Sequence, residues 1–498
     1  MAGDRAAARA AADGATDRAG ARAAARRAGS ERAGSERAAP ERAPADRGAA
    51  DRAAQRMNDP LLGRFLLGLA EGMNAAAESV DQIRTDMTRV ARAYGRDDID
   101  FVVLPTVILV ETGTGEAGRV AIRSVSASFR FDQIAALYGL LGEAKEAAVD
   151  PADGIDRLNE IGRMRPKRGW LVRTFGHAVL TAGLALLLTP TWEGALVAFV
   201  LGALIGVAKL VPSPTLQLVF PVFAAFVCGV AVFLLAPHFP LGDPLRLLIA
   251  PLATFLPGGV LTTAVMELAA GQMIAGASRL VMGMVQLGLL AFGILAAGTV
   301  VGVADSSYAP LASAESLPWW VGWLALLLFA IGNYLHFSAP GSTFAWVLLA
   351  LVVAYLGQLI GTALLGATVS GFIGALAMTP VVLWIASLPK GAPAQLTFLP
   401  AYWLLVPGAA GLVALTEAVG ASEGFDDFAL ALVSIMSIAL GVLIGTALYR
   451  AVHHGAEELA AFHIEKPIAA VTGGAGSVWS RLRSRLGSRF RSPLRRRG

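Results

Sequence analysis

The amino-acid sequence predicts an all-α polytopic membrane protein with about ten transmembrane helices, arranged as two inverted five-helix repeats and preceded by a small cytoplasmic α/β domain. Of its 498 residues, 55% are hydrophobic and only 16% are charged, whereas soluble domains carry about 25% charged residues. No Asp, Glu, Lys or Arg occurs between Ser316 and Pro389. A helical bundle in lipid tolerates such a stretch, because lipid-facing side chains need no solvating groups.

Two compositionally biased tails flank the predicted membrane protein. Residues 1–57 are rich in Ala and Arg and contain almost no large apolar side chain. Such a segment buries too little apolar surface to offset its ordering entropy, so we expect it to be disordered. Residues 453–498 form a basic tail, which we expect on the cytoplasmic side, resting on anionic lipid.

Residues 58–168 are predicted to form the cytoplasmic α/β domain. A β-branched run over 99–110, a Gly-rich turn and a second run over 119–126 predict a β-hairpin. Helical spacing of apolar residues and the sequence Asp-Pro at position 150 predict the remaining elements. The predicted helical segments are 61–94 (one or two helices), about 131–148, and one that starts at Asp150.

Ten apolar segments follow this domain, in two sets of five. We expect the first five-span repeat in residues 169–304 and the second in residues 316–452. About 20 apolar residues suffice to cross the hydrocarbon core of a bilayer as a helix. The predicted spans lie near residues 170–189, 193–211, 215–236, 245–270, 279–303, 318–338, 343–365, 368–388, 397–418 and 426–450.

The charges in the short loops predict the orientation of the spans. Cytoplasmic loops of membrane proteins carry an excess of Lys and Arg. Basic residues precede the first span, and the even-numbered loops contain Lys209, Arg279 and Lys390, whereas acidic residues gather in the odd-numbered loops. We therefore expect a multi-pass protein of the plasma membrane with both termini in the cytoplasm.

The fourth and the ninth span contain the same helix-breaking pattern, a Pro-Gly pair followed by a glutamate. The matching residues are Pro257, Gly258 and Glu267 in the fourth span and Pro407, Gly408 and Glu417 in the ninth, 150 residues later. An odd number of spans per repeat forces the two halves into opposite orientations. Interrupted spans in inverted repeats indicate the central site of a transporter. Two kinks that serve only helix packing are the alternative interpretation.

The Pro-Gly pairs also suggest what such a site binds. Proline lacks an amide hydrogen and clashes with the preceding turn, so a new half-helix is expected to start with unpaired amide groups that suit a carboxylate. The candidate substrate-binding residues are Pro257, Gly258, Gly259, Thr262, Thr263, Gln217, Pro407 and Gly408. The candidates for coupling or gating are Glu267, Arg279, Glu417 and Lys209. A purely structural ion pair between Glu267 and Arg279 is the alternative for those two residues.

The residues around the first Pro-Gly pair resemble the motif of the threonine/serine exporter family (ThrE type). The resemblance is carried by Phe255-Leu256-Pro257-Gly258-Gly259 with Glu267-Leu268, and by Val90-Ala91-Arg92-Ala93-Tyr94-Gly95 in the preceding domain. It extends over about residues 60–450, with both five-span halves in one chain. It implies export of threonine and serine from the cytoplasm, driven by the proton motive force. The family's small-hydroxyl pattern is replaced here by Glu71-Gly72-Met73-Asn74-Ala75.

Two other functions stay open. The first is export of another small carboxylate, such as a dicarboxylate. The second is a membrane-tethered hydrolase with its catalytic residues in 58–168. That segment contains no His and no Cys, which argues against thiol or Ser-His chemistry. The carboxylates of Asp97, Asp98 and Glu111 are the remaining catalytic candidates, although we expect no enzyme.

The expected partners follow from these predictions. They are the lipid bilayer, a small amino-acid substrate and protons, with a homo-oligomer left open and no nucleic acid. The six histidines have no metal-ligand spacing beyond the adjacent pair His453-His454. We therefore expect neither a cofactor nor a metal.

Overall fold

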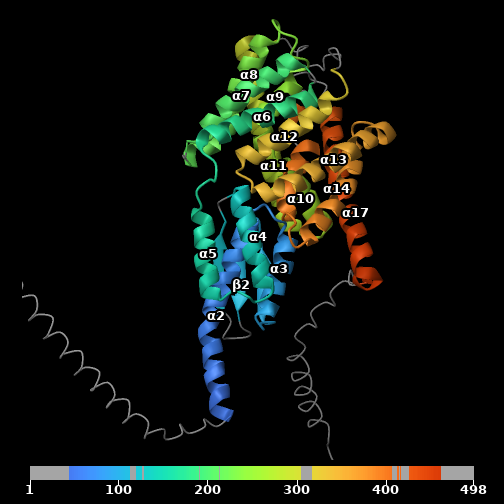
Figure 1. Cartoon of the computed structure of the whole chain (residues 1–498). Coiled ribbons are helices and arrows are strands. Elements are labelled where there is room, and N and C mark those ends of the chain that lie inside the picture. Colours follow the sequence, from blue (N-terminus) through green and yellow to red (C-terminus); the bar gives the residue numbers. More distant parts are fainter. Residues whose placement is uncertain are drawn as a thin grey trace, which may run out of the picture. The chain divides into compact units, whose positions relative to one another are not determined.

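The structure is a computed structural model of the chain. It describes residues 44–112, 119–125, 128–189, 191–211, 214–303, 317–405, 412–413, 416 and 425–460. The chain divides into two compact units, Met1–Leu62 and Gly63–Gly498. The second unit holds the β-sheet and the helices from α3 onward (Figure 1).

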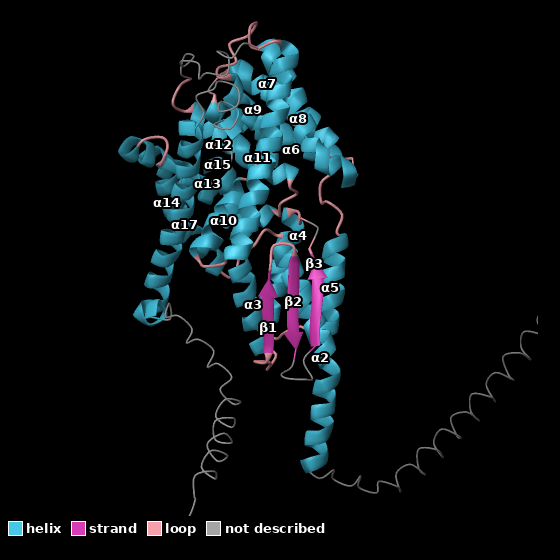
Figure 2. Cartoon of the chain, turned by 180° about the vertical axis from the view of Figure 1, so that it is seen from behind, coloured by secondary structure: helices cyan, strands magenta, loops and turns pink. Residues whose placement is uncertain are grey.

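A three-stranded antiparallel sheet with the order β1-β2-β3 forms the β part of the α/β domain (Figure 2). Its strands are β1 (Ile99–Val103), β2 (Val107–Thr112) and β3 (Arg119–Ser124). The hairpin of β2 and β3 lies where the sequence predicts one. The predicted strand 99–110 is instead two strands, because the chain turns at Pro105, which has no N–H for the ladder. The amide of Leu104 closes this turn by donating to the carbonyl of Val107 (2.8 Å).

Four helices accompany the sheet in sequence. They are α2 (Pro44–Ala75), α3 (Val80–Ala93), α4 (Phe131–Lys145) and α5 (Pro151–Arg163). Ser79 and Asp150 cap α3 and α5, each with its side chain accepting from a backbone amide. Residues 44–57 lie in α2, although their composition predicts disorder, since alanine favours the helix strongly. Residues 1–43 of the predicted disordered tail lie outside the described residues.

Apolar helices make up the rest of the second unit. They are α6 (Trp170–Leu188), α7 (Trp192–Ala208), α8 (Pro214–Leu235), α9 (Pro244–Leu252), the 3-10 turn η2 (Ala253–Phe255), α10 (Gly258–Ala269), α11 (Met273–Val301), α12 (Val321–His336), η4 (Gly341–Thr343), α13 (Phe344–Leu365), α14 (Ser370–Ser387), α15 (Ala394–Leu405) and α17 (Phe425–Ala460). The end of α17 includes the start of the predicted basic tail, of which residues 461–498 lie outside the described part of the chain.

The lengths of these helices define a multi-pass membrane protein. Within the described residues, five helices are long and apolar enough to cross a membrane, and the bent pair of α9–η2 and α10 adds a sixth. Three further apolar helices are shorter. A helix begins in each of the ten predicted spans or within a few residues of it. The count of ten membrane spans and the inverted arrangement of the two halves stay predictions.

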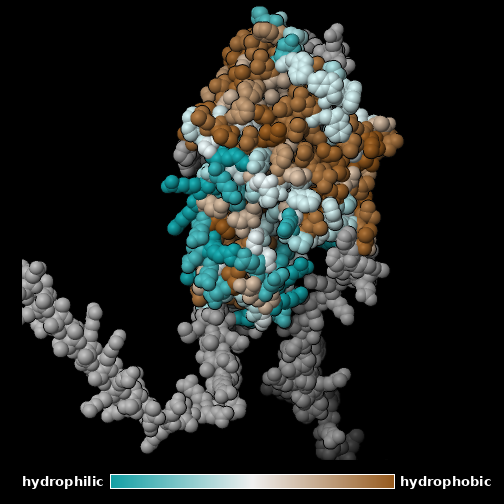
Figure 3. Space-filling view, viewed as in Figure 1, coloured by the Kyte–Doolittle hydropathy of each residue, from teal (hydrophilic) through white to brown (hydrophobic). Residues whose placement is uncertain are grey.

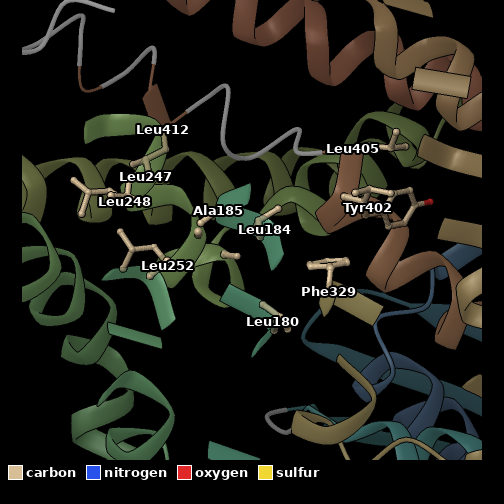
Figure 4. Packing of buried hydrophobic residues seen from close by; sticks show 14 of the residues in the cluster. Leu180, Leu184, Ala185, Leu247, Leu248, Leu252, Phe329, Tyr402, Leu405 and Leu412 are labelled. Carbon is tan, nitrogen blue, oxygen red and sulfur yellow. The ribbon is translucent and has the colours of Figure 1, made fainter. Parts of the chain in front are cut away.

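Close helix packing in this part depends on glycine. Helices α6 and α12 lie along each other. A Cβ atom at Gly332 would lie 2.2 Å from the backbone nitrogen of Leu180, and one at Gly183 would lie 2.6 Å from that of Phe329. Around this crossing, leucine, alanine and phenylalanine side chains from both predicted halves form one buried apolar cluster, part of which Figure 4 shows. Small residues therefore bring the two backbones together, as in other membrane helix pairs.

The outer surface of the apolar helices is hydrophobic. Leu196 of α7, Phe223 of α8, Phe292 of α11 and Leu364 of α13 are each more than half exposed. In Figure 3, brown atoms cover the face over α7 and α8, whereas hydrophilic atoms gather over α5. A soluble protein rarely exposes so much contiguous apolar surface, and a lipid bilayer accounts for it.

Candidate functional site

The fourth predicted span is broken at the Pro-Gly pair. Its two parts, Pro244–Phe255 and Gly258–Ala269, meet at an angle of 71°. Pro257 occupies the N-cap position of α10 and offers no side-chain hydrogen bond to the helix. The first amides of α10 therefore lack the capping group that Ser, Thr or Asp supplies elsewhere.

Two polar side chains lie at this break. The amide of Gln286 on α11 donates to the carbonyl of Phe255 (2.7 Å), which satisfies one of the groups that the break sets free. Thr262 is fully buried one turn into α10, and its hydroxyl has no hydrogen-bond partner among the described residues. The side chains of a helix tilt toward its N-terminus. The Thr262 hydroxyl is therefore directed toward the end of α10 that carries the free amides.

The start of α10 faces the ninth predicted span. A Cβ atom at Gly259 would lie 3.9 Å from side-chain carbons of Leu399 and Tyr402 on α15. The two spans that share the Pro-Gly pattern are therefore neighbours at this point. The second break itself, Pro407 and Gly408, lies outside the described residues, and so does Glu417.

The structure gives only the positions of two further predicted binding residues, Thr263 and Gln217. Thr263 is half-buried beside Thr262 on α10. Gln217 belongs to the first turn of α8, and its side chain lies outside the described part of the structure.

A polar cluster that the sequence interpretation did not assemble lies on the other side of the break. Lys209 ends α7, and its ammonium group donates to the hydroxyl of Thr254 in η2. The same ammonium lies 4.3 Å from the centre of the Phe255 ring, within the range of a cation–π contact. His177 of α6 also reaches Thr254, with 3.2 Å between Nε2 and the hydroxyl oxygen. We call Lys209, Thr254 and His177, together with His336, the polar cluster.

The hydrogen-bond partners fix the tautomers in the polar cluster. Nδ1 of His177 lies 2.7 Å from the carbonyl of Gly202, and Nδ1 of His336 lies 3.0 Å from the carbonyl of Arg173. A carbonyl only accepts, so both Nδ1 atoms carry hydrogen. Nε2 of His177 is then free to accept from Thr254, whose oxygen accepts from Lys209. The two imidazole rings are in contact, with 4.7 Å between their centroids.

The far end of α10 is tied to the α/β domain. Oε1 of Glu267 accepts from the backbone amide of Val80 (3.1 Å), the first residue of α3. Its other oxygen forms an ion pair with Nε of Arg279 (3.1 Å), without the alignment of a hydrogen bond. Arg279 also donates to the backbone carbonyl of Glu78 (3.3 Å). Both predicted coupling residues on this side therefore join α10 and α11 to the start of α3.

Glu78 extends this junction. Its buried carboxyl group accepts from the hydroxyl of Tyr138 on α4 and from the side chain of Gln395 on α15. Burial raises the pKa of Glu78 above its ordinary value, although these hydrogen bonds act in the opposite direction. The pKa of Tyr138 is raised well above its ordinary value, first by burial and then by the charge of Glu78.

The carboxylates proposed for hydrolysis do not converge. Asp98 pairs with Arg96 at 2.7 Å, and this hydrogen bond lowers the pKa of Asp98. Asp97 pairs with Arg92 at 3.4 Å. Both aspartates and Glu111 on β2 are exposed. A carboxylate with a lowered pKa, such as Asp98, makes a poor general acid at neutral pH.

One pocket lies beside Asn333 of α12. Its lining includes Phe131, Tyr334 and Thr343 but no charged side chain. The side-chain oxygen of Asn333 is buried there without a hydrogen-bond partner among the described residues. Without a charged group the pocket suits a zwitterionic amino acid less well than the break does.

His177, Thr254, His336 and Glu78 were not among the residues predicted from the sequence. A signal for the first three was present, because a polar side chain inside an apolar span indicates a functional or structural contact. Their grouping was hidden, since they come from α6, η2 and the end of α12. No pattern within the sequence links these three segments.

A multi-pass bundle whose broken span meets buried polar groups defines a helical membrane transporter. Residues 64–301 match the model of the ThrE family, described as "Putative threonine/serine exporter". The matched residues run from α2 to the end of α11, and over them the chain carries this family's domain. No curated protein and no solved structure matches the chain. The second five-span half lies outside the match, so the fused two-half form stays a prediction.

Proposed function

We propose that the protein is a secondary active exporter that moves threonine and serine out of the cytoplasm, driven by the proton motive force. The observation that carries this proposal is the break at Pro257, with an uncapped helix start and the buried hydroxyl of Thr262, which has no partner among the described residues. Membership of an exporter-type family supports the same reading. The chain would lie in the plasma membrane with both termini in the cytoplasm.

The chemistry of threonine and serine fits these groups. Both carry a carboxylate, which the free amides and positive dipole end at Gly258 and Gly259 would attract. Both also carry a hydroxyl group, which pairs naturally with the hydroxyl of Thr262. Burying a hydroxyl group without a hydrogen bond costs free energy. A bound substrate hydroxyl would give the Thr262 hydroxyl the hydrogen-bond partner that it lacks.

The test of substrate uses cells that lack the gene for this protein and are fed a threonine-containing dipeptide. We expect them to accumulate intracellular threonine and to excrete it more slowly than cells that carry the gene. Unchanged accumulation and efflux would contradict an amino-acid exporter. Faster accumulation of a dicarboxylate instead would favour the alternative substrate class.

The test of the site uses the same cells complemented with a Pro257→Ala variant. Alanine restores the amide hydrogen and removes the clash, so the span would straighten and export would fall to the level of cells without the protein. Gly288→Ala on α11 is the matched control, because a Cβ there meets no atom within 4 Å. Normal export by a membrane-inserted Pro257→Ala variant would remove the broken span from the mechanism.

A further inference from the structure

The polar cluster contains one lysine, whose ammonium group has no counter-charge among the described residues. Lys209 is half-buried between Thr254 and the Phe255 ring. No carboxylate of the described residues lies within ion-pair distance of its ammonium group, whereas Glu267 at the far end of α10 is paired with Arg279. An ammonium group in an apolar protein interior is costly without a counter-charge.

The neighbours of Lys209 supply hydrogen-bond capacity but no negative charge. Thr254 accepts from the ammonium and has His177 as an acceptor for its own hydrogen. An ammonium group has three donors, and the hydroxyl of Thr254 occupies one of them. The protonated Lys209 therefore offers further N–H donors at the edge of the break that begins with Leu256 and Pro257.

We propose that Lys209 provides the counter-charge for a carboxylate of the transported metabolite and makes that carboxylate a requirement for binding. Thr254 orients the ammonium, and His177 is a positioning residue that holds Thr254. The inference rests on the proposed function for the identity of the substrate, but it concerns any small carboxylate that this transporter carries. The ammonium of Lys209 contacts Thr254 and Phe255 just before the break, and the free amides at the start of α10 follow directly after it.

The experiment compares each acid with a neutral analogue, using the full chain purified in nanodiscs. Dissociation constants are measured by calorimetry for L-threonine against threoninol, which replaces the carboxylate by an alcohol, and for succinate against succinamide. We expect the wild type to bind threonine at least about tenfold more tightly than threoninol, and Lys209→Met to lose this preference. Lys209→Arg keeps the positive charge and should retain most of the preference for threonine over threoninol.

Lys390→Met is the matched control, since Lys390 is an exposed lysine in another loop. It should keep the wild-type preference for the acid. Equal binding of acid and neutral analogue by the wild type would overturn the inference without any variant. A Lys209→Met protein that melts at a lower temperature but keeps the preference would also overturn it, because Lys209 would then only cap the end of α7. Binding of succinate in place of threonine, with the preference lost in Lys209→Met, would refute the proposed substrate and support the counter-charge.

Discussion

Thr262 carries a buried hydroxyl that has no partner in the described structure. A Thr262→Val substitution removes no hydrogen bond of the free protein, so stability should stay within about 0.5 kcal/mol or rise slightly. If the hydroxyl binds substrate, the dissociation constant for threonine should increase about tenfold. Calorimetry and thermal melting of the same sample separate the two effects.

Thr263→Val is the control for that substitution, because Thr263 is its half-buried neighbour on the same helix. It should leave the affinity for threonine near the wild-type value. Unchanged affinity in Thr262→Val would show that this hydroxyl does not contact the substrate.

Glu78 predicts how stability depends on pH. Its folded pKa is raised above the ordinary value of 4.5, mainly by burial, so the folded state keeps the proton to higher pH than the unfolded state does. The stabilising effect of this proton is complete below pH 4.5 and is lost as the pH rises through the folded pKa. Glu78→Gln cannot lose a proton, so the Tm of the wild type should fall relative to this variant as the pH rises above about 4.5.

Glu143 has the opposite effect on the pH dependence of stability and serves as the control. Its pKa is lowered by a hydrogen bond from Arg157, so its contribution is present above pH 4.5 and is lost as the pH falls through the folded pKa. The Tm of Glu143→Gln should therefore rise relative to that of the wild type only at acidic pH. Parallel melting curves of wild type and Glu78→Gln at all pH values would contradict a buried, proton-retaining Glu78.

At the scale of elements, the α6–α12 crossing should tolerate no added methyl group. A Cβ at Gly332 would lie 2.2 Å from the nitrogen and 2.4 Å from the Cα of Leu180, which are backbone atoms that cannot rotate away. Gly332→Ala should lower stability by about 3 kcal/mol, the upper end of overpacking costs. The Tm in detergent measures this loss, with Gly288→Ala expected to melt like the wild type. Equal melting of the two variants would refute the close crossing.

The ion pair of Glu267 and Arg279 predicts coupling between α10 and α11. The side chains are 1% and 11% exposed, so removing one partner leaves a nearly buried charge and should cost about 3 kcal/mol. The double variant Glu267→Gln/Arg279→Met should lose much less than the sum of the single variants. Thermal melting of all four proteins completes the cycle. Additive losses would indicate that the two charges do not interact.

The types of the secondary-structure elements were largely predictable from the sequence, whereas the positions at which helices and strands are interrupted were harder to predict. Apolar runs indicate the membrane helices, and Pro257-Gly258 marks the break in α9–α10, because each of these signals is local. The run 99–110 looked continuous, since its only interruption is Pro105 inside an otherwise β-branched segment. Residues 44–57 are helical although their low apolar content predicts disorder, because alanine has the highest helix propensity.

The candidate site was only partly predictable, for a physical reason. Thr262 and Gly259 lie within a few residues of the Pro-Gly pair, and their proposed roles in binding were inferred from helix geometry. Lys209 was expected to act in gating, yet its contact with Thr254 joins α7 to η2 across 45 residues of sequence. His336 reaches the cluster from beyond α11. Long-range contacts of this kind depend on helix packing, which periodicity does not encode.

At the scale of the whole molecule, we propose one polypeptide that moves an amino acid against its gradient. The helices and the ThrE match indicate the transporter class, and we propose that the substrate passes the buried polar groups at the broken span. Coupling to protons needs a gradient across a closed membrane. Only a reconstituted system controls both the gradient and the composition of each side.

The most direct test is uptake of radiolabelled threonine into proteoliposomes that contain the purified full chain and have an acidified lumen. An exporter that exchanges threonine for protons should concentrate threonine in the lumen as protons leave, and a protonophore should abolish the accumulation. Liposomes without protein, and liposomes with a lumen at the external pH, should show no accumulation. Threonine accumulation that is absent, or that is unaffected by the proton gradient, would contradict the proposed proton-driven export.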